Sequence, residues 1–436
     1  MPVTCGAETI PGAGQQPDRC LRVPGATRNG PRRTLRTVAA ASRTDPGTRP
    51  GGAPGWLDHA AATPLHPAAR EALLACLDDG WADPERRDPR SRHARALLDG
   101  AREAVAGTLG VGFAEVSFAG SATQATQLAL LGTLRARHRE GRRLVASAVE
   151  HSAVLHVGQR LVADGGDTVV VPVDGDGVVA PDAFLAACTP GTVAAALQAA
   201  NGEVGCRQPL AAVGPALAER GVALHVDATA LLPGELPDAA AWQPSTLTLD
   251  AAGWGGPAGV GVLVVRPGTR WQAPLPPDGR EGGRVPGRSF LPAVVAAAAA
   301  LLVTAPGQAA LARRHAELTG RLRAELPRLV PDLVLHGPAD PAARVPSLLS
   351  FSLLYVDAEA LLLRLAARGV VVGSGSACVA DSLEPSHVLS AMGTLTGGNL
   401  RLSLGWPSTA ADVERLLAEL PGAVAELRDE AGVTGL

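Results

Sequence analysis

One cysteine of this chain lies in a setting that suits sulfur chemistry. Cys378 ends the Gly- and Ser-rich stretch G-S-G-S-A-C of residues 373–378. A thiol reacts as its thiolate and only where a partner can reach it, so small flanking residues favour a nucleophilic role over an inert one. The remaining cysteines form no C-x-x-C pair and show no spacing typical of metal ligands, so we interpret them as ordinary core or tail thiols. They are Cys5, Cys20, Cys76, Cys188 and Cys206.

The chain contains no lysine, since all 39 of its Lys or Arg positions are arginine. A guanidinium stays protonated and is not a usable amine nucleophile. Chemistry that passes through a lysine amine is therefore not open to any side chain of this protein. The N-terminus is the one primary amine left, and it begins a segment without apolar periodicity.

Alternating patterns predict the elements that position the polar residues. Helical spacing of apolar residues covers 68–79, 95–109 and 122–137, and short apolar runs predict strands at 115–118, 144–148, 168–171, 194–198 and 223–226. Such alternation favours an α/β fold with a mostly parallel sheet and helices on both faces. Ligands of these sheets bind at the carboxyl ends of the strands. The polar segments that follow the strands are therefore expected to form one pocket: Ala119–Thr123, Glu150–His151, Asn201–Glu203 and Asp227–Thr229.

The sequence predicts three parts. Residues 1–55 are rich in Pro, Gly, Arg and Thr, and we interpret them as a disordered tail or an over-extended start. Residues 56–305 are predicted to form a large α/β domain. A charged helix over 308–326 leads into a smaller α+β domain, residues 306–436, with strands at 347–354 and 400–403, helices over 358–368 and from Thr409, and the cysteine loop.

Six segments, in order, resemble landmarks of the cysteine desulfurases. They are W-L-D-H-A-A-A-T-P from Trp56, F-A-G-S-A-T from Phe118, V-E-H-S-A-V-L from Val149, N-G-E-V-G from Asn201, H-V-D-A-T from His225, and G-S-G-S-A-C-V-A-D-S-L-E-P-S-H-V-L-S-A-M-G from Gly373. The resemblance runs from Trp56 to the C-terminus. It implies fold type I of the pyridoxal-phosphate enzymes, class V aminotransferase branch, as a homodimer that converts L-cysteine to alanine and leaves a sulfane sulfur on its own cysteine.

By this resemblance, several cofactor positions are retained. Asp227 corresponds to the carboxylate that pairs with the pyridinium nitrogen, His151 to the imidazole that stacks on the ring and passes protons, and Asn201 to the amide near the ring hydroxyl. Thr123 opens a helix where a phosphate would bind. From the residues alone, an alternative remains for each of two residues: Asp227 as a helix cap or loop aspartate, and His151 as an ordinary loop histidine.

The resemblance also assigns the two groups that would act on the substrate. Arg401 corresponds to the bidentate clamp on the carboxylate of the substrate. Cys378 corresponds to the nucleophile that attacks the sulfur of the bound cysteine.

The losses are concentrated around the anchor of the cofactor. The family segment S-G-H-K-x-x-G-P-K-G aligns with Asp250–Gly259, which puts Gly253 at the lysine position. An aspartate next to a phosphate costs free energy through Coulomb repulsion. The altered positions are Asp250 for a serine, Ala252 for a histidine, Gly253 for the lysine, Ala230 for a glutamine and Phe290 for a threonine that reaches across the dimer.

Composition sets limits on partners and compartment. A net charge of −3 and a pI near 6.4 give no electrostatic case for nucleic acid or an anionic membrane as a main partner. The apolar run Ala293–Val303 is too short to cross a bilayer, so we expect no membrane segment. Free thiols fit a reducing cytoplasm.

Two hypotheses from different classes follow. In the first, the chain is a degenerate relative that forms a homodimer, or pairs with a true desulfurase, and takes up sulfur on Cys378 or regulates its partner, with covalent binding of pyridoxal phosphate absent. In the second, it is an active cysteine desulfurase whose cofactor condenses directly with substrate cysteine, without a lysine.

Overall fold

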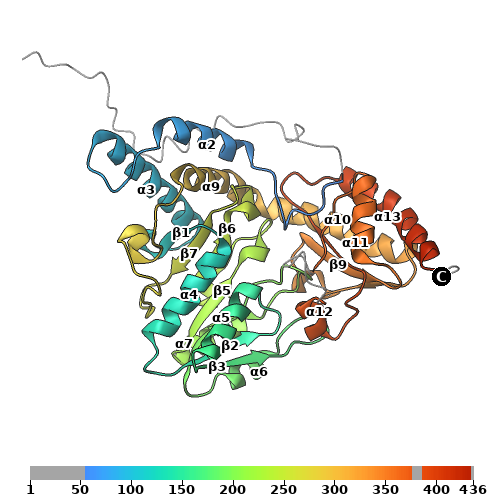
Figure 1. The fold of residues 1–436 in the computed structure, drawn as a ribbon, viewed down its shortest axis with the longest axis horizontal. Coiled ribbons are helices and arrows are strands. Elements are labelled where there is room, and N and C mark those ends of the chain that lie inside the picture. Colours follow the sequence, from blue (N-terminus) through green and yellow to red (C-terminus); the bar gives the residue numbers. More distant parts are fainter. Residues whose placement is uncertain (1–54, 376–384, 434–436) are drawn as a thin grey trace, which may run out of the picture.

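The computed structural model describes residues 55–375 and 385–433, and a seven-stranded sheet forms the centre of its larger part (Figure 1). The strand order is β1 (Val116–Ala119), β7 (Gly261–Val265), β6 (Thr246–Asp250), β5 (Ala223–Asp227), β4 (Thr192–Ala196), β2 (Arg143–Ser147) and β3 (Asp167–Val171). β7 runs antiparallel to β1 and β6, and the other neighbours pair in parallel. The predicted α/β fold with a mostly parallel sheet is confirmed.

Helices cover both faces of this sheet. One face packs against α4 (Ala122–Ala136) and α5 (Ser152–Ala163) through a cluster that contains Leu130, Leu144 and Val154. The opposite face packs against the remaining helices of this part, whose apolar residues join the largest core cluster. These helices are α2 (Pro67–Asp79), α3 (Pro89–Leu109), α6 (Pro181–Ala187), α7 (Leu210–Glu219), α8 (Ala239–Trp242) and α9 (Leu291–Thr304).

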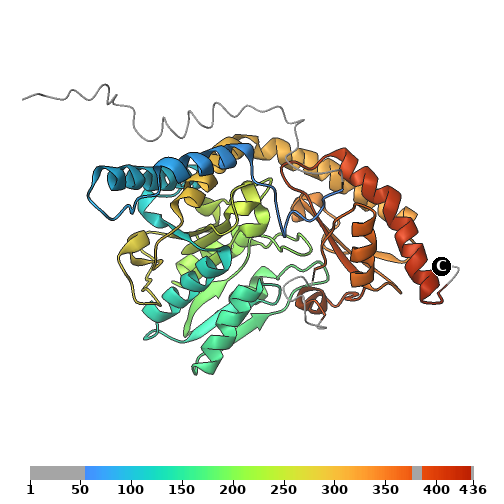
Figure 2. The same ribbon diagram turned by 45° about the horizontal axis from the view of Figure 1, so that its top comes forward.

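The alanine-rich helix α9 is a core helix. Every residue of α9 from Leu291 to Leu301 is buried, and α9 packs against α2 and α3. The three helices lie side by side (Figure 2), and small side chains such as the alanines of α9 let helices approach closely. By length and composition the span Leu291–Leu329, which joins α9 to α10, would suffice to cross a membrane, but half of its most apolar window is buried inside the fold.

A three-stranded antiparallel sheet, in the order β10 (Asn399–Ser403), β9 (Leu348–Leu353), β8 (Leu333–Leu335), organises the smaller part (Figure 1). It has its own core, which includes Leu322 and Phe351. Leu57 also belongs to this core, and its amide donates to Val371 O over 2.8 Å, so the start of the described chain packs on the smaller part. The helices are α10 (Gln308–Leu329), α11 (Ala358–Ala367), α12 (His387–Met392) and α13 (Ala410–Glu430).

Single-turn 3-10 helices complete the described fold. They are η1 (Phe113–Glu115), η2 (Thr229–Leu231), η3 (Ala251–Trp254), η4 (Arg280–Gly283), η5 (Ala305–Gly307) and η6 (Pro341–Ala343). η2 and η3 directly follow β5 and β6, so they lie at the edge of the sheet where ligands of parallel sheets bind.

Candidate functional site

The polar segments expected to converge do meet at the carboxyl edge of the parallel strands. Asn201, after β4, donates from Nδ2 to the carbonyl of Val149, after β2, over 3.0 Å. The amide of Ala228, after β5, donates to Thr248 O of β6 over 2.9 Å. The loops that carry Glu150, Asn201, Asp227 and Asp250 therefore form one continuous wall.

The amide group of Asn201 shapes its own loop. Its Oδ1 accepts from the backbone amides of Glu203 and Val204, each over 2.8 Å, and the residue is 3% exposed. Together with the bond to Val149, these contacts occupy most of the hydrogen-bonding capacity of the side chain. Asn201 therefore holds the pocket wall together, and a contact with a ligand would use its one remaining N–H.

Asp227 and His151 each accept a hydrogen bond from a backbone amide two residues ahead. This is the local role that the sequence analysis kept as an alternative to cofactor binding. Asp227 Oδ1 accepts from the amide of Thr229 over 2.9 Å, and His151 Nδ1 accepts from the amide of Ala153 over 3.1 Å at the start of α5. The bond to Thr229 uses one oxygen of the Asp227 carboxylate and leaves the second for a further contact. Asp227 and His151 lie at the same edge of the sheet, beside Glu150.

Glu150 is a buried acid that our sequence reasoning did not single out. It has no exposed surface, Oε1 accepts from the amide of Gln198 over 2.9 Å, and Oε2 has no hydrogen-bond partner. The pKa of Glu150 is raised to about 8, because burial and the nearby charge of Asp227 raise it by more than the bond from Gln198 and the charge of His151 lower it. The sequence does carry a signal for Glu150, since an acid follows a buried strand and precedes His151. That position alone does not indicate a buried carboxyl.

We expect Glu150→Gln to stabilise the fold more at alkaline pH than at acidic pH. The folded pKa of Glu150, about 8, lies above the ordinary value of 4.5. The contribution of Glu150 to the free energy of unfolding is therefore fully present below pH 4.5 and is lost as pH rises towards 8. Above pH 8 the variant should gain about 1–3 kcal/mol over the wild type. Thermal melts at pH 5 and pH 8.5 would measure this. The exposed Glu219→Gln is the control, and a gain independent of pH would contradict the assignment.

The N-terminus of α4 holds Thr123, the residue predicted for the phosphate. Thr123 is exposed in the first turn of α4. Ser121 caps this helix, with Oγ accepting from the amide of Gln124 over 3.1 Å. The carboxylate of Asp250 lies at the same place. Its Oδ1 accepts from the backbone amide of Ala252 over 2.9 Å, and burial raises its pKa while the nearby amides of Ala252 and Ala122 lower it. The positive end of the α4 dipole therefore faces an acid of the same chain.

The segment around Gly253 is closed from the side of η2. A β-carbon built on Gly253 would lie 2.9 Å from Leu232 Cβ, closer than two such carbons approach without a backbone shift. Trp254 fixes the segment from behind, since it is 1% exposed and its Nε1 donates to Ala297 O of α9 over 2.9 Å. Ala252 and Ala230, half-buried nearby, carry methyl groups where polar side chains were expected. These residues do not fit a covalently held, phosphate-bearing cofactor.

Arg401 is paired within the chain. Its Nη2 forms an ion pair of 3.0 Å with Asp58 Oδ1, and Nη1 donates to the carbonyl of Gly202 over 3.4 Å. Arg401 Nε is buried without a hydrogen-bond partner. A carboxylate that bound to Arg401 would therefore compete with Asp58, an acid that the sequence analysis quoted but gave no role.

Cys378 lies outside the described residues, and the nearest described residues on either side are held by β10 and by the pocket wall. On one side the amide of Gly375 donates to Asn399 Oδ1 over 2.7 Å. On the other, Ser386 Oγ donates to Glu203 Oε2 over 2.9 Å, and His387 Nε2 lies 3.0 Å from Glu150 O. Burial raises the pKa of Glu203.

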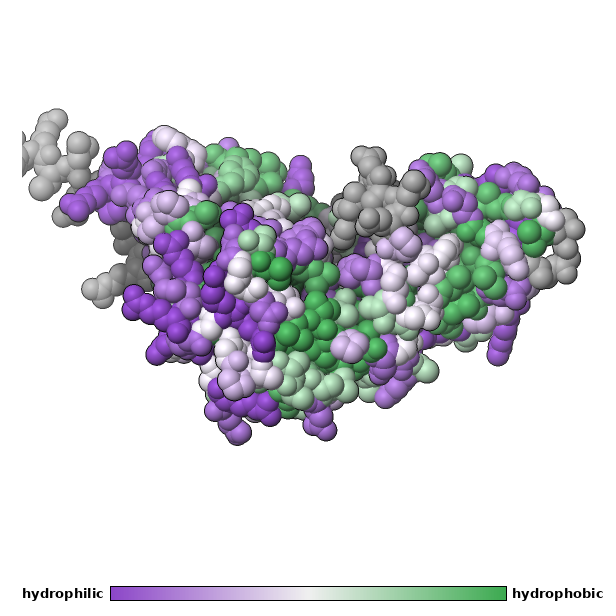
Figure 3. Space-filling view, turned by 60° about the horizontal axis from the view of Figure 1, so that its bottom comes forward, coloured by the Kyte–Doolittle hydropathy of each residue, from purple (hydrophilic) through white to green (hydrophobic). Residues whose placement is uncertain are grey.

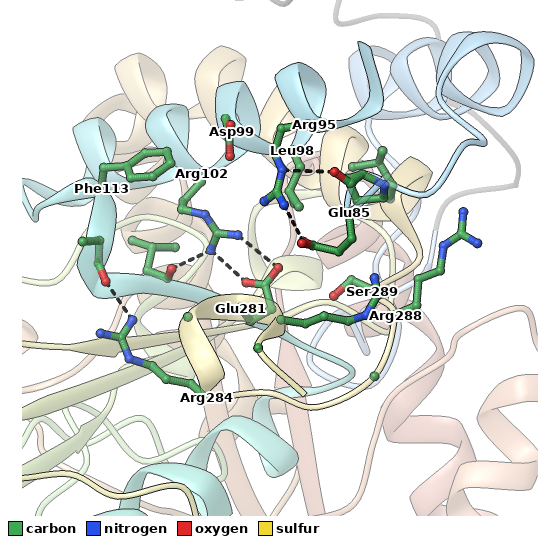
Figure 4. Close-up of a pocket in the computed structure, with 18 residues that line it drawn as sticks. Glu85, Arg95, Leu98, Asp99, Arg102, Phe113, Glu281, Arg284, Arg288 and Ser289 are labelled. Atoms are coloured by element: carbon green, nitrogen blue, oxygen red, sulfur yellow. Dashed lines mark hydrogen bonds and ion pairs between the residues drawn. The ribbon is translucent and has the colours of Figure 1, made fainter. Parts of the chain in front are cut away.

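Phe290 is not brought to this wall. It is 61% exposed and precedes α9, at the end of the loop 279–290. That loop borders a separate cavity of about 300 Å³ under α3, where Arg102 and Arg95 point from the helix towards Glu281 and Glu85 (Figure 4). Hydrophilic side chains gather at this end of the molecule (Figure 3). The arginines there form ion pairs and donate hydrogen bonds to backbone carbonyls.

Comparison with known proteins decides the family. The sequence profile described as Aminotransferase class-V matches residues 55–416. The chain is 32% identical over 392 residues to "Cysteine desulfurase 1" of Trichormus variabilis, with 86% of this chain and 96% of that protein covered. The chain belongs to the cysteine desulfurase family. It is 28% identical over 377 residues to "Cysteine desulfurase IscS" of Clostridium botulinum, covering 86% and 95%.

A solved structure agrees with this membership. A protein titled "NIFS-LIKE PROTEIN" superposes with a TM-score of 0.79 at 25% identity, covering 86% of this chain and all of that one. The family resemblance and the fold type are thereby confirmed. Members of this family work with pyridoxal phosphate, so membership supports that cofactor in general. The roles of individual residues in this homologue stay predictions.

Proposed function

We propose that this cysteine desulfurase homologue lacks covalent cofactor chemistry and serves as a sulfur-accepting or regulatory partner in the cytoplasm. The observation that carries the proposal is the absence of any lysine, with Gly253 at the aligned position. Two further observations support it: a side chain at position 253 would meet Leu232 Cβ, and the carboxylate of Asp250 lies where a phosphate would bind. The protein would act as a homodimer or would pair with an active desulfurase.

The sulfur step that we propose needs no cofactor. The thiolate of Cys378 attacks the terminal sulfur of a donor persulfide, a new S–S bond forms on Cys378, and the S–S bond of the donor breaks. The donor leaves as a thiolate, so no external oxidant or reductant is required. Two described residues that flank Cys378 in the sequence are held near the pocket, Gly375 by Asn399 of β10 and Ser386 by Glu203 of the wall.

The thiols of the described residues are poor competitors with Cys378 for this role. Burial raises the pKa of Cys76 and Cys188 to about 11 and that of Cys206 to about 12. A buried thiol with a raised pKa forms little thiolate near neutral pH. Sulfur uptake should therefore discriminate strongly between these cysteines and a reactive one.

We expect persulfide on Cys378 well above Cys76, Cys188 and Cys206 when the protein is incubated with an active desulfurase and L-cysteine. Mass spectrometric mapping of persulfides measures this. Cys378→Ser should abolish the signal, and Cys206→Ser is the matched control that should leave it intact. Equal labelling of all sites, or none, would contradict the carrier role and leave only a regulatory partner.

The active enzyme is the second candidate, favoured by the retained set Asp227, His151, Asn201 and Arg401 and by relatives named as cysteine desulfurases. We expect no alanine formation from L-cysteine with added pyridoxal phosphate, because no lysine amine is present to hold the cofactor or shuttle protons. Sustained turnover that is lost on Asp227→Ala would establish the active reading instead.

A further inference from the structure

The N-terminal turn of α4 is tightly bound to the ends of β6 and β7. Thr126 Oγ1 of α4 lies 3.1 Å from Thr248 Oγ1 of β6. Gly261 of β7 pairs with Asp250, and a β-carbon built on Gly261 would lie 2.2 Å from the carbonyl oxygen of Ser121. This turn therefore packs directly against the strand ends that carry Asp250.

Side chains of this segment accept from two backbone amides of the turn. Gly120 N donates to Gln124 Oε1 over 2.7 Å, and Gln124 N donates to Ser121 Oγ over 3.1 Å. Burial raises the pKa of the Asp250 carboxyl, and the amide of Ala122 lies near enough to act against that rise. An anion at a helix N-terminus is held by such amides and by the helix dipole. Here side-chain oxygens accept hydrogen bonds from two of these amides, and the carboxylate of Asp250 supplies the negative charge.

We propose that Asp250 is an internal substitute for a bound phosphate group, so that this pocket excludes phosphate-bearing ligands. The carboxylate takes the position that a phosphate would need, lies near the α4 amide of Ala122, and balances the helix dipole without any ligand. It also accepts from the amide of Ala252 and so caps the start of η3. The inference deepens the proposed function by naming the class of ligand that the pocket rejects.

Removing the charge of Asp250 should convert this turn into a phosphate site. We expect Asp250→Ser to lower the melting temperature in chloride buffer, and inorganic phosphate at equal ionic strength to restore part of the loss. The melting temperature of the wild type should not respond to phosphate. Affinity for pyridoxal phosphate, followed by quenching of tryptophan fluorescence, should rise by at least about tenfold in the variant.

Two further variants keep the test decisive. Asp250→Asn retains an oxygen for the amides and loses only the charge, so it serves if the serine variant folds poorly. Asp238→Asn is the matched control, because Asp238 Oδ1 caps α8 through Ala241 N over the same 2.9 Å. Equal stabilisation of wild type and variants by phosphate, or equal affinity for pyridoxal phosphate, would overturn the proposal. Neither result depends on alanine formation or on persulfide at Cys378, so the two proposals fail separately.

Discussion

Replacing Gly253 with lysine is expected to leave the protein without a borohydride-stable adduct after incubation with pyridoxal phosphate. A new amine at this position meets two obstacles. Its β-carbon would lie 2.9 Å from Leu232 Cβ, so the side chain enters only with a shift of η2 or η3. Overpacking of this kind costs about 1–3 kcal/mol. The Asp250 carboxylate would also still face the phosphate, and like charges in a partly buried site repel strongly.

Intact mass after borohydride reduction measures the adduct, and absorbance reports any bound cofactor. The wild type should be colourless and show no added mass on any internal residue. The triple variant Gly253→Lys, Asp250→Ser, Leu232→Ala removes both obstacles and should gain an adduct, which makes it the positive control. An adduct in the single Gly253→Lys variant would show that neither obstacle matters.

Local sequence patterns predicted most of the strands and helices of the fold. The strands β2, β3, β4 and β5 follow short apolar runs, and each begins and ends within two residues of its prediction. β6 and β7 were not predicted, although residues 261–265 form an apolar run, because the Gly- and Pro-rich segment between them is typical of a loop. The antiparallel direction of β7 follows from the short connection through η3, since a parallel crossover needs a dozen or more residues.

The candidate site was predictable in its location but not in its contacts. Residues after parallel strands meet at one edge, which a sequence reader can infer for Asn201 and Asp227. That Asp250 points at the α4 amides, or that Asp58 pairs with Arg401, depends on distances between segments far apart in the chain. The unpartnered oxygen of Glu150 is likewise a property of packing, which no local pattern encodes.

The ion pair between Arg102 and Glu281 is a buried structural element with a large expected effect on stability. The side chains are 9% and 3% exposed, and two N–O contacts of 2.8 and 3.0 Å join them (Figure 4). Glu281 Oε2 also accepts from the amide of Phe118 over 2.8 Å, and Arg102 Nη1 donates to the carbonyl of Val116. The pair thus ties α3, β1 and the loop 279–290 together.

We expect Arg102→Ala to destabilise the protein by about 3–5 kcal/mol, because it leaves the Glu281 carboxylate buried without its cation. Arg95→Ala breaks a pair with Glu85 in which both side chains are 41% exposed, and should cost at most about 1 kcal/mol. Denaturant titration compares the two midpoints. Arg102→Met with Glu281→Gln removes both charges and should recover part of the loss. If Arg102→Ala and Arg95→Ala unfolded at the same denaturant concentration, the buried pair would contribute no more than an exposed one, and the loop that ends at Phe290 would be held by other contacts.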